Sequence, residues 1–138
     1  MQNIRFQSHI ADIRMKIESD SLPELFLAGL SGMNQLLKKY PEQNNGESAI
    51  LRTINIKSVD TTTMLIDFLS EVLTLSHIDQ AVFTEVDFNH LSDHEISAII
   101  KGIKLDHFDE DVKAVTYHEA NIKQNQKGKW STIVIFDI

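Results

Sequence analysis

The sequence contains no cysteine, an absence that excludes several kinds of site at once. Disulfide scaffolds, thiolate zinc sites, iron–sulfur clusters and cysteine nucleophiles all require the thiol group. Long apolar runs are missing as well: residues 1–6 do not resemble a signal peptide, and no stretch approaches the ~20 apolar residues of a membrane-spanning helix. We therefore expect a soluble, cytoplasmic protein without a membrane partner.

Basic residues are scarce relative to acidic ones, with 13 Lys and Arg against 20 Asp and Glu and a formal net charge of −7. A protein that holds RNA or DNA across a broad surface needs clustered Lys and Arg side chains to contact the phosphates. The sequence also lacks the Walker A, GxGxxG, HExxH and GxSxG motifs of phosphate-binding loops and common hydrolases. These absences argue against broad nucleic-acid binding and against a familiar catalytic centre.

The rest of the composition is that of an ordinary globular protein, with 42% apolar and 24% charged residues. A length of 138 residues favours a single domain over residues 1–138. Hydrophobic periodicity predicts strands over 11–18 and 50–57, helices over 22–39 and 60–77, and two hairpins, formed by 82–88 with 96–100 and by 115–122 with 130–137. We expect an α+β fold in which both helices pack on one mixed or antiparallel β-sheet that contains both chain ends.

Local signals support the two predicted helix starts. Ser21 and Glu24 have the spacing of a capping box, and Pro23 lies in the first turn, where its missing N–H costs nothing. Asp60 is a suitable N-cap for the threonines that follow it. Residues 92–94 favour the turn of the first hairpin.

Two aspartates at strand ends are candidate metal ligands. Asp12 lies early in the first predicted strand, and Asp137 ends the last one on the same face as Ile133 and Ile135. If that face is buried, the carboxylate needs a cation or several N–H donors. If the two strands are neighbours, both carboxylates converge with the terminal carboxylate of Ile138, a set of hard ligands suited to Ca²⁺ or Mg²⁺. The residues alone leave the alternative open that both aspartates are solvated, as is usual at strand ends.

Other polar residues allow two interpretations each. Lys113, Tyr117 and His118 lie close together at the start of a predicted strand, where they form either a partner surface or the wet face of an amphipathic strand. Asp67 and Glu71 are four residues apart on the second predicted helix and therefore share one face. Facing the sheet they could support metal ligands, and facing solvent they have no special role.

Four segments resemble the motifs of the archease family. Residues 6–13, FQSHIADI, are similar to the N-terminal F-x-H-T-A-D-I-G motif, and residues 65–73, LIDFLSEVL, resemble the helix L-x-D-W-L-N-E-L-L. Residues 112–118, VKAVTYH, match V-K-A-[IV]-T-Y-H, and residues 134–138, VIFDI, resemble the terminal V-x-x-D-I. The motifs follow the family order across nearly the whole chain.

The resemblance implies a small α+β protein cofactor that is not itself an enzyme. Archeases act on RtcB-type RNA ligases, which join RNA ends in tRNA splicing and RNA repair. The resemblance therefore implies that the protein promotes guanylylation of the ligase's active-site histidine and allows the ligase to turn over repeatedly.

The resemblance also implies a metal site. The family's ligands carry over to Asp12, Asp137 and a terminal oxygen of Ile138, the same groups that the residues alone single out. The expected metal is calcium, with magnesium or manganese as alternatives. In the N-terminal motif, Ile10 replaces the family's threonine and Arg14 replaces its glycine, and in the helix motif Phe68 and Ser70 replace its tryptophan and asparagine. An arginine so close to Asp12 could pair with it and partly replace a cation.

The remaining candidate residues form two groups under this resemblance. Those expected to support the metal ligands are His9, Asp67 and Glu71. Those expected to contact the ligase are Lys113, Tyr117 and His118.

Two other functions stay open on the sequence. A metal-dependent hydrolase would use Asp12 and Asp137 with His9 or His118, although no nucleophile arrangement is recognisable. A chaperone-like module would bind unfolded proteins and hold a metal without catalysis.

Overall fold

A computed structural model describes residues 12–41 and 49–138 of the chain. The strands are β1 (Asp12–Ser19), β2 (Ile50–Lys57), β3 (Ala81–Leu91), β4 (Glu95–Lys104), β5 (Ala114–Thr116), β6 (Lys123–Gln124) and β7 (Trp130–Asp137), and the helices are α1 (Leu22–Leu37) and α2 (Thr61–Asp79). None of the helices within the described ranges has the length and apolar content needed to cross a membrane.

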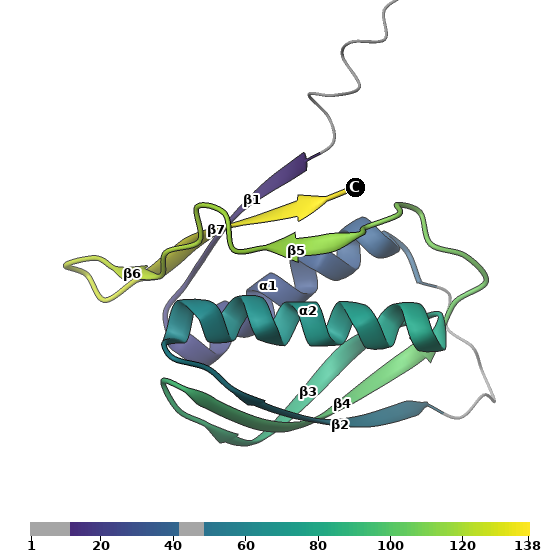
Figure 1. Cartoon of the computed structure of the whole chain (residues 1–138), viewed down its shortest axis with the longest axis horizontal. Helices are drawn as coiled ribbons and strands as arrows, with labels where there is room; N and C mark the ends of the chain where they lie inside the picture. The colour runs from purple at the N-terminus through teal and green to yellow at the C-terminus, as the bar shows by residue number, and fades with distance from the viewer. Residues whose placement is uncertain (1–11, 42–48) are drawn as a thin grey trace, which may run out of the picture.

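Both helices lie between two antiparallel sheets (Figure 1). The four-stranded sheet has the order β1-β7-β5, with β6 also paired to β7, and the three-stranded sheet has the order β2-β4-β3. The prediction of an α+β fold with two helices is confirmed, but the prediction of a single sheet is wrong. Two sheets form because α2 is apolar around much of its circumference, so its apolar surface must be covered by a sheet on each side. Its buried residues are Met64, Leu65, Ile66, Phe68, Leu69, Val72, Leu73 and Ser76.

The predicted helix starts are confirmed. The Ser21 hydroxyl accepts a hydrogen bond from the Glu24 backbone N–H at 3.3 Å and donates to the Glu24 carboxylate at 3.0 Å. The Asp60 carboxylate accepts from the Thr63 backbone N–H at 2.7 Å. These side chains satisfy N–H groups that have no partner within the first helical turn.

The end of α1 differs from the prediction by two residues. The helix ends at Leu37 rather than at residue 39 because a later segment binds its last turn. The Asp109 backbone N–H donates to the Leu37 carbonyl at 2.7 Å, and the Lys39 backbone N–H donates to the Asp109 carboxylate at 2.9 Å. These bonds replace further helical hydrogen bonding.

The two ends of the described chain meet in one sheet, as predicted. Strand β1 runs antiparallel to β7 along its whole length. Met15 and Ile17 point from β1 towards α1, where Gly32 permits a close approach: a Cβ at that position would lie 2.1 Å from the Met15 sulfur. The other face of this sheet therefore points away from the helices, and we call it the outer face.

The last predicted hairpin is interrupted. Seven positions separate Thr116 from Lys123, whereas four separate their partners Ile135 and Ser131, so three extra residues lie between β5 and β6. The prediction of a continuous strand over 115–122 is wrong. The chain turns out of the sheet after β5, and Glu119 adopts a left-handed conformation with φ of 58°.

Candidate metal and partner-binding site

Asp12 and Asp137 lie directly opposite each other on neighbouring strands. Side chains of directly paired residues share a face, and their Cβ atoms are typically about 4.5–5.5 Å apart. Both aspartates are on the outer face, where Asp12 is exposed and Asp137 half-buried. Ile138 follows immediately and is partly buried against the core. The structure thus brings together the two carboxylates that the sequence singled out.

The expected burial of the face that carries Asp137 is only partly correct. The core face of β7 carries Val134 and Phe136, which are fully buried. Ile135 lies on the outer face and is nevertheless only 5% exposed. Asp137 itself is at the rim of the sheet, so its charge is accessible to solvent or to a cation.

Arg14 does not form the pair with Asp12 that its position in the sequence allows. Its guanidinium binds the carboxylate of Glu119, which follows β5. Because β7 lies between β1 and β5, this ion pair crosses over the outer face. The hydrogen bond from Arg14, followed by the attraction of its charge, lowers the pKa of Glu119, and the hydrogen bond to Glu119 raises the pKa of Arg14. Among the described residues, Asp12 forms no ion pair.

The two aspartates do not by themselves complete a metal site. No group of three or more His, Asp or Glu side chains suited to a metal occurs within residues 12–41 and 49–138. A third ligand would have to come from another group. His9 lies outside the described residues, so its predicted supporting role is not addressed.

Lys113 is positioned by the segment that connects the two sheets, residues 105–113, which we call the strap. Near its start, the Leu105 carbonyl accepts a hydrogen bond from the Gln80 side chain at 2.8 Å. Near its end, the Val112 carbonyl accepts one from His77 Nε2 at 2.8 Å. The Lys113 backbone N–H then donates to the Asp137 carbonyl at 2.8 Å. The strap therefore holds the backbone of Lys113 beside Asp137.

Asp67 contacts Tyr117, not the aspartate pair. Its carboxylate accepts hydrogen bonds from the Tyr117 hydroxyl and from the Ser58 hydroxyl, the latter at 2.6 Å. The hydrogen bond to Asp67 is the main cause that raises the pKa of Tyr117. Tyr117 remains 58% exposed, so its ring is fixed at one end and open to solvent along its length. The sequence suggested Asp67 as support for the metal ligands, whereas the structure shows it supporting a partner-surface candidate.

The other candidates are exposed. Glu71 lies one turn beyond Asp67 on α2 and faces solvent. His118 is exposed in the turn after β5, where its backbone N–H donates to the Thr116 hydroxyl at 3.2 Å. The sequence analysis missed Glu119 as a partner of Arg14, and no local signal marks a left-handed glutamate in advance.

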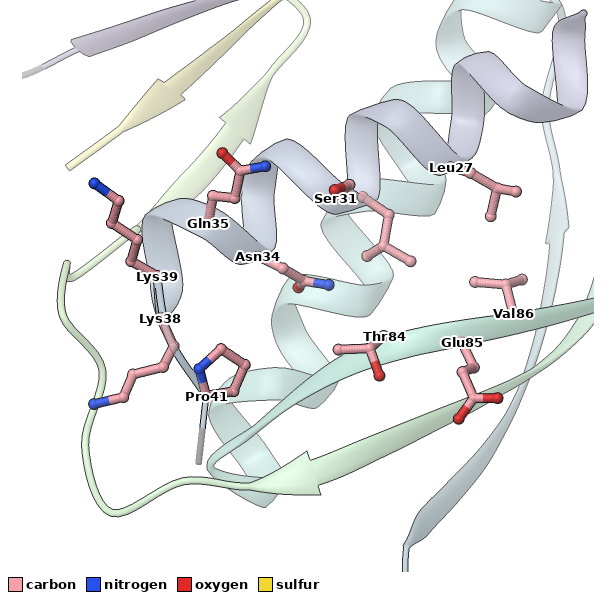
Figure 2. Close-up of a pocket in the computed structure, with 11 residues that line it drawn as sticks. Leu27, Ser31, Asn34, Gln35, Lys38, Lys39, Pro41, Thr84, Glu85 and Val86 are labelled. Atoms are coloured by element: carbon pink, nitrogen blue, oxygen red, sulfur yellow. The ribbon is translucent and has the colours of Figure 1, made fainter. Parts of the chain in front are cut away.

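A groove of about 540 Å³ lies between α1 and β3, and neither Asp12 nor Asp137 lines it (Figure 2). Leu27 of α1 and Val86 of β3 line it from opposite sides (Figure 2). Two of its charged side chains are already paired: Lys38 with the strap, and Glu85 with Lys101 at 3.8 Å. The sequence did not predict this groove, because it depends on how a helix and a distant strand pack.

Comparison with known proteins places the chain in a sequence family. The model of the archease protein family matches residues 5–138. A protein archease from Methanosarcina barkeri is 31% identical over 142 residues, which cover 96% of this chain and 94% of the relative. A protein archease from Pyrococcus abyssi is 28% identical over 145 residues, which cover both chains completely.

Solved structures show the same fold. The crystal structure of a Thermotoga maritima protein, described as an archease and possible chaperone, matches with a TM-score of 0.68 at 16% identity, over 94% of this chain and 93% of that one. The solution structure of a Methanobacterium thermoautotrophicum protein matches with a TM-score of 0.66 at 26% identity, over 93% of both chains. Sequence and fold agree over nearly the full length, and this chain belongs to the archease family.

Proposed function

We propose that this protein is a cofactor of an RtcB-type RNA ligase and has no ligase or GTPase activity of its own. In this proposal it promotes guanylylation of the ligase's active-site histidine and allows repeated turnover in tRNA splicing or RNA repair. Membership of the archease family supports the proposal, and the direct pairing of Asp12 with Asp137 is the observation that carries it. A net charge of −7 also suits docking on a basic, RNA-binding partner.

The proposed metal site consists of Asp12, Asp137 and a terminal oxygen of Ile138, with calcium as first candidate and magnesium or manganese as alternatives. The donor set fits a hard cation, because two carboxylates share one accessible sheet face. Arg14 forms an ion pair with neither aspartate, because its guanidinium is bound by Glu119. A bound divalent cation supplies positive charge that offsets phosphate charge in nucleotidyl transfer.

The proposed contact surface for the ligase consists of Lys113, Tyr117 and His118. The strap keeps the backbone of Lys113 next to Asp137, so a cationic side chain and the aspartate pair belong to one end of the sheet. Tyr117 offers an exposed aromatic ring whose hydroxyl is already held by Asp67. Immobilised aromatic side chains of this kind are enriched among residues that dominate binding energy.

Guanylylation assays with a cognate RtcB-type ligase test this proposal. With GTP and divalent metal present, the protein should raise the level of ligase–GMP adduct and convert single-turnover ligation to multiple turnover. Lys113→Ala should weaken activation about tenfold, the effect of losing about 1.4 kcal/mol of contact free energy. Lys127→Ala removes the same charge from an exposed turn and should leave both activation and melting temperature unchanged.

Other outcomes would point to the alternatives. Equal activation by the Lys113 and Lys127 variants would remove Lys113 from the contact surface. GTP hydrolysis by the purified protein, lost in Asp12 and Asp137 variants, would favour the hydrolase. Suppression of aggregation of unfolded proteins, with no effect on the ligase, would favour the chaperone-like module.

Calorimetry tests the metal site separately. The protein should bind Ca²⁺, and Asp137→Asn should weaken binding by about 100-fold, because even partners that only support metal ligands are worth about 10–100-fold in affinity. Asp87→Asn is the matched control, an exposed aspartate on the other sheet. Equal Ca²⁺ binding by the wild-type and Asp137→Asn proteins would reject the site.

A further inference from the structure

Arg14 lies within reach of three carboxylates on the outer face. Asp12 precedes it by two residues on β1, so the two side chains share a face and their Cα atoms are about 6.5 Å apart. Asp137 lies diagonally across on β7, a position about 7–8 Å away that long side chains still reach. The guanidinium nevertheless binds the third carboxylate, that of Glu119.

The backbone after β5 brings Glu119 to this position. The chain leaves the sheet at a turn in which the Ala120 backbone N–H donates to the Tyr117 carbonyl at 3.2 Å. The left-handed conformation of Glu119 belongs to this turn, and few residues other than glycine adopt it readily. The Asn121 backbone N–H then donates to the Thr132 hydroxyl on β7 at 3.0 Å, which returns the segment to the sheet. The turn is thus anchored on both sides of Glu119.

We infer that Glu119 is a positioning residue that holds Arg14 away from Asp12 and thereby sets the cation affinity of the Asp12–Asp137 pair. The inference rests on the proposed metal site. Without Glu119, Asp12 and Asp137 remain on the same face as Arg14, within reach of its long side chain. A guanidinium bound to either of them would occupy carboxylate lone pairs and place a positive charge beside the cation.

A double-mutant cycle measured by Ca²⁺ calorimetry tests this inference. Glu119→Gln keeps the shape of the side chain and should weaken Ca²⁺ binding about tenfold, the effect of a unit charge about 6–7 Å from a divalent ion in a largely aqueous setting. Arg14→Gln/Glu119→Gln should bind Ca²⁺ like the wild type, and in the Arg14→Gln background Glu119→Gln should have almost no effect. Exposed ion pairs contribute little to stability, so melting temperatures should stay close to that of the wild type.

Two controls separate this inference from general electrostatics. Glu18→Gln removes the same charge from the far end of β1 and should leave Ca²⁺ affinity nearly unchanged. A crystal structure of Glu119→Gln grown without metal should show the Arg14 guanidinium against Asp12 or Asp137. Both results would support a local role for Glu119.

The contrary results are distinct. If Glu119→Gln weakens binding equally with and without Arg14, the effect is that of the overall field and the inference is overturned while the metal site stands. If Arg14 points to solvent in the Glu119→Gln crystal, the inference is likewise overturned. If the wild-type protein binds no Ca²⁺, the proposed metal site fails, and the inference fails with it.

Discussion

Asp12→Ala should remove most of the ligase activation while the protein still binds the ligase. The variant deletes one of two carboxylates that face each other on β1 and β7, and metal affinity should fall by about 100-fold or more. Asp12 is exposed at the rim of the sheet, so its loss should not disturb the core. The formation of ligase–GMP adduct and the binding of the ligase are measured side by side.

The matched control for this prediction is Glu18→Ala, an acidic residue on the same face of β1. It should activate the ligase like the wild type. Loss of ligase binding together with activation in Asp12→Ala would instead assign Asp12 to docking. Full activation by Asp12→Ala would contradict the role of the aspartate pair altogether.

Phe68→Ala should lower the free energy of unfolding by about 3–5 kcal/mol, the usual cost of emptying a buried aromatic site. Phe68 is fully buried on α2 and connects three elements. Its ring centroid lies 5.8 Å from that of Phe26 on α1 and 6.0 Å from that of Phe88 on β3. Because domains of this size are stable by only about 5–15 kcal/mol, the variant should be close to unfolding.

Urea denaturation measures this effect. Phe68→Leu retains most of the apolar volume and should cost clearly less than Phe68→Ala. Val59→Ala truncates a side chain that is 89% exposed, and its effect should stay within about 0.5 kcal/mol. A cost below about 1 kcal/mol for Phe68→Ala would contradict the placement of this ring between the helices and the three-stranded sheet.

The elements that sequence reasoning predicted correctly are those with local signals. The Ser21 and Asp60 caps mark both helix starts, and the structure shows both caps formed. The hairpin of β3 and β4 follows from two apolar segments joined by a short polar turn, and it is present. Each of these signals lies within a few residues, where backbone geometry and side-chain chemistry act directly.

The number of sheets could not be predicted in the same way. Hydrophobic periodicity shows that a helix such as α2 is buried widely, but it does not show whether one sheet or two cover it. The interruption after β5 has a similar origin. Three extra residues leave the ladder because the segment bonds to α2, where the Thr62 hydroxyl accepts from the Ile122 backbone N–H at 3.0 Å.

In the candidate site, too, some features follow from the sequence and others depend on the tertiary structure. The sequence by itself determined that Asp12 lies early in the first strand and Asp137 ends the last one, because the alternation of apolar residues marks both strands and their side-chain faces. Only the tertiary structure decided that these strands are neighbours in direct register, and that Arg14 binds Glu119, 105 positions away, instead of Asp12. Local propensities carry no information about such contacts, since register and a left-handed turn depend on the packing of the whole sheet.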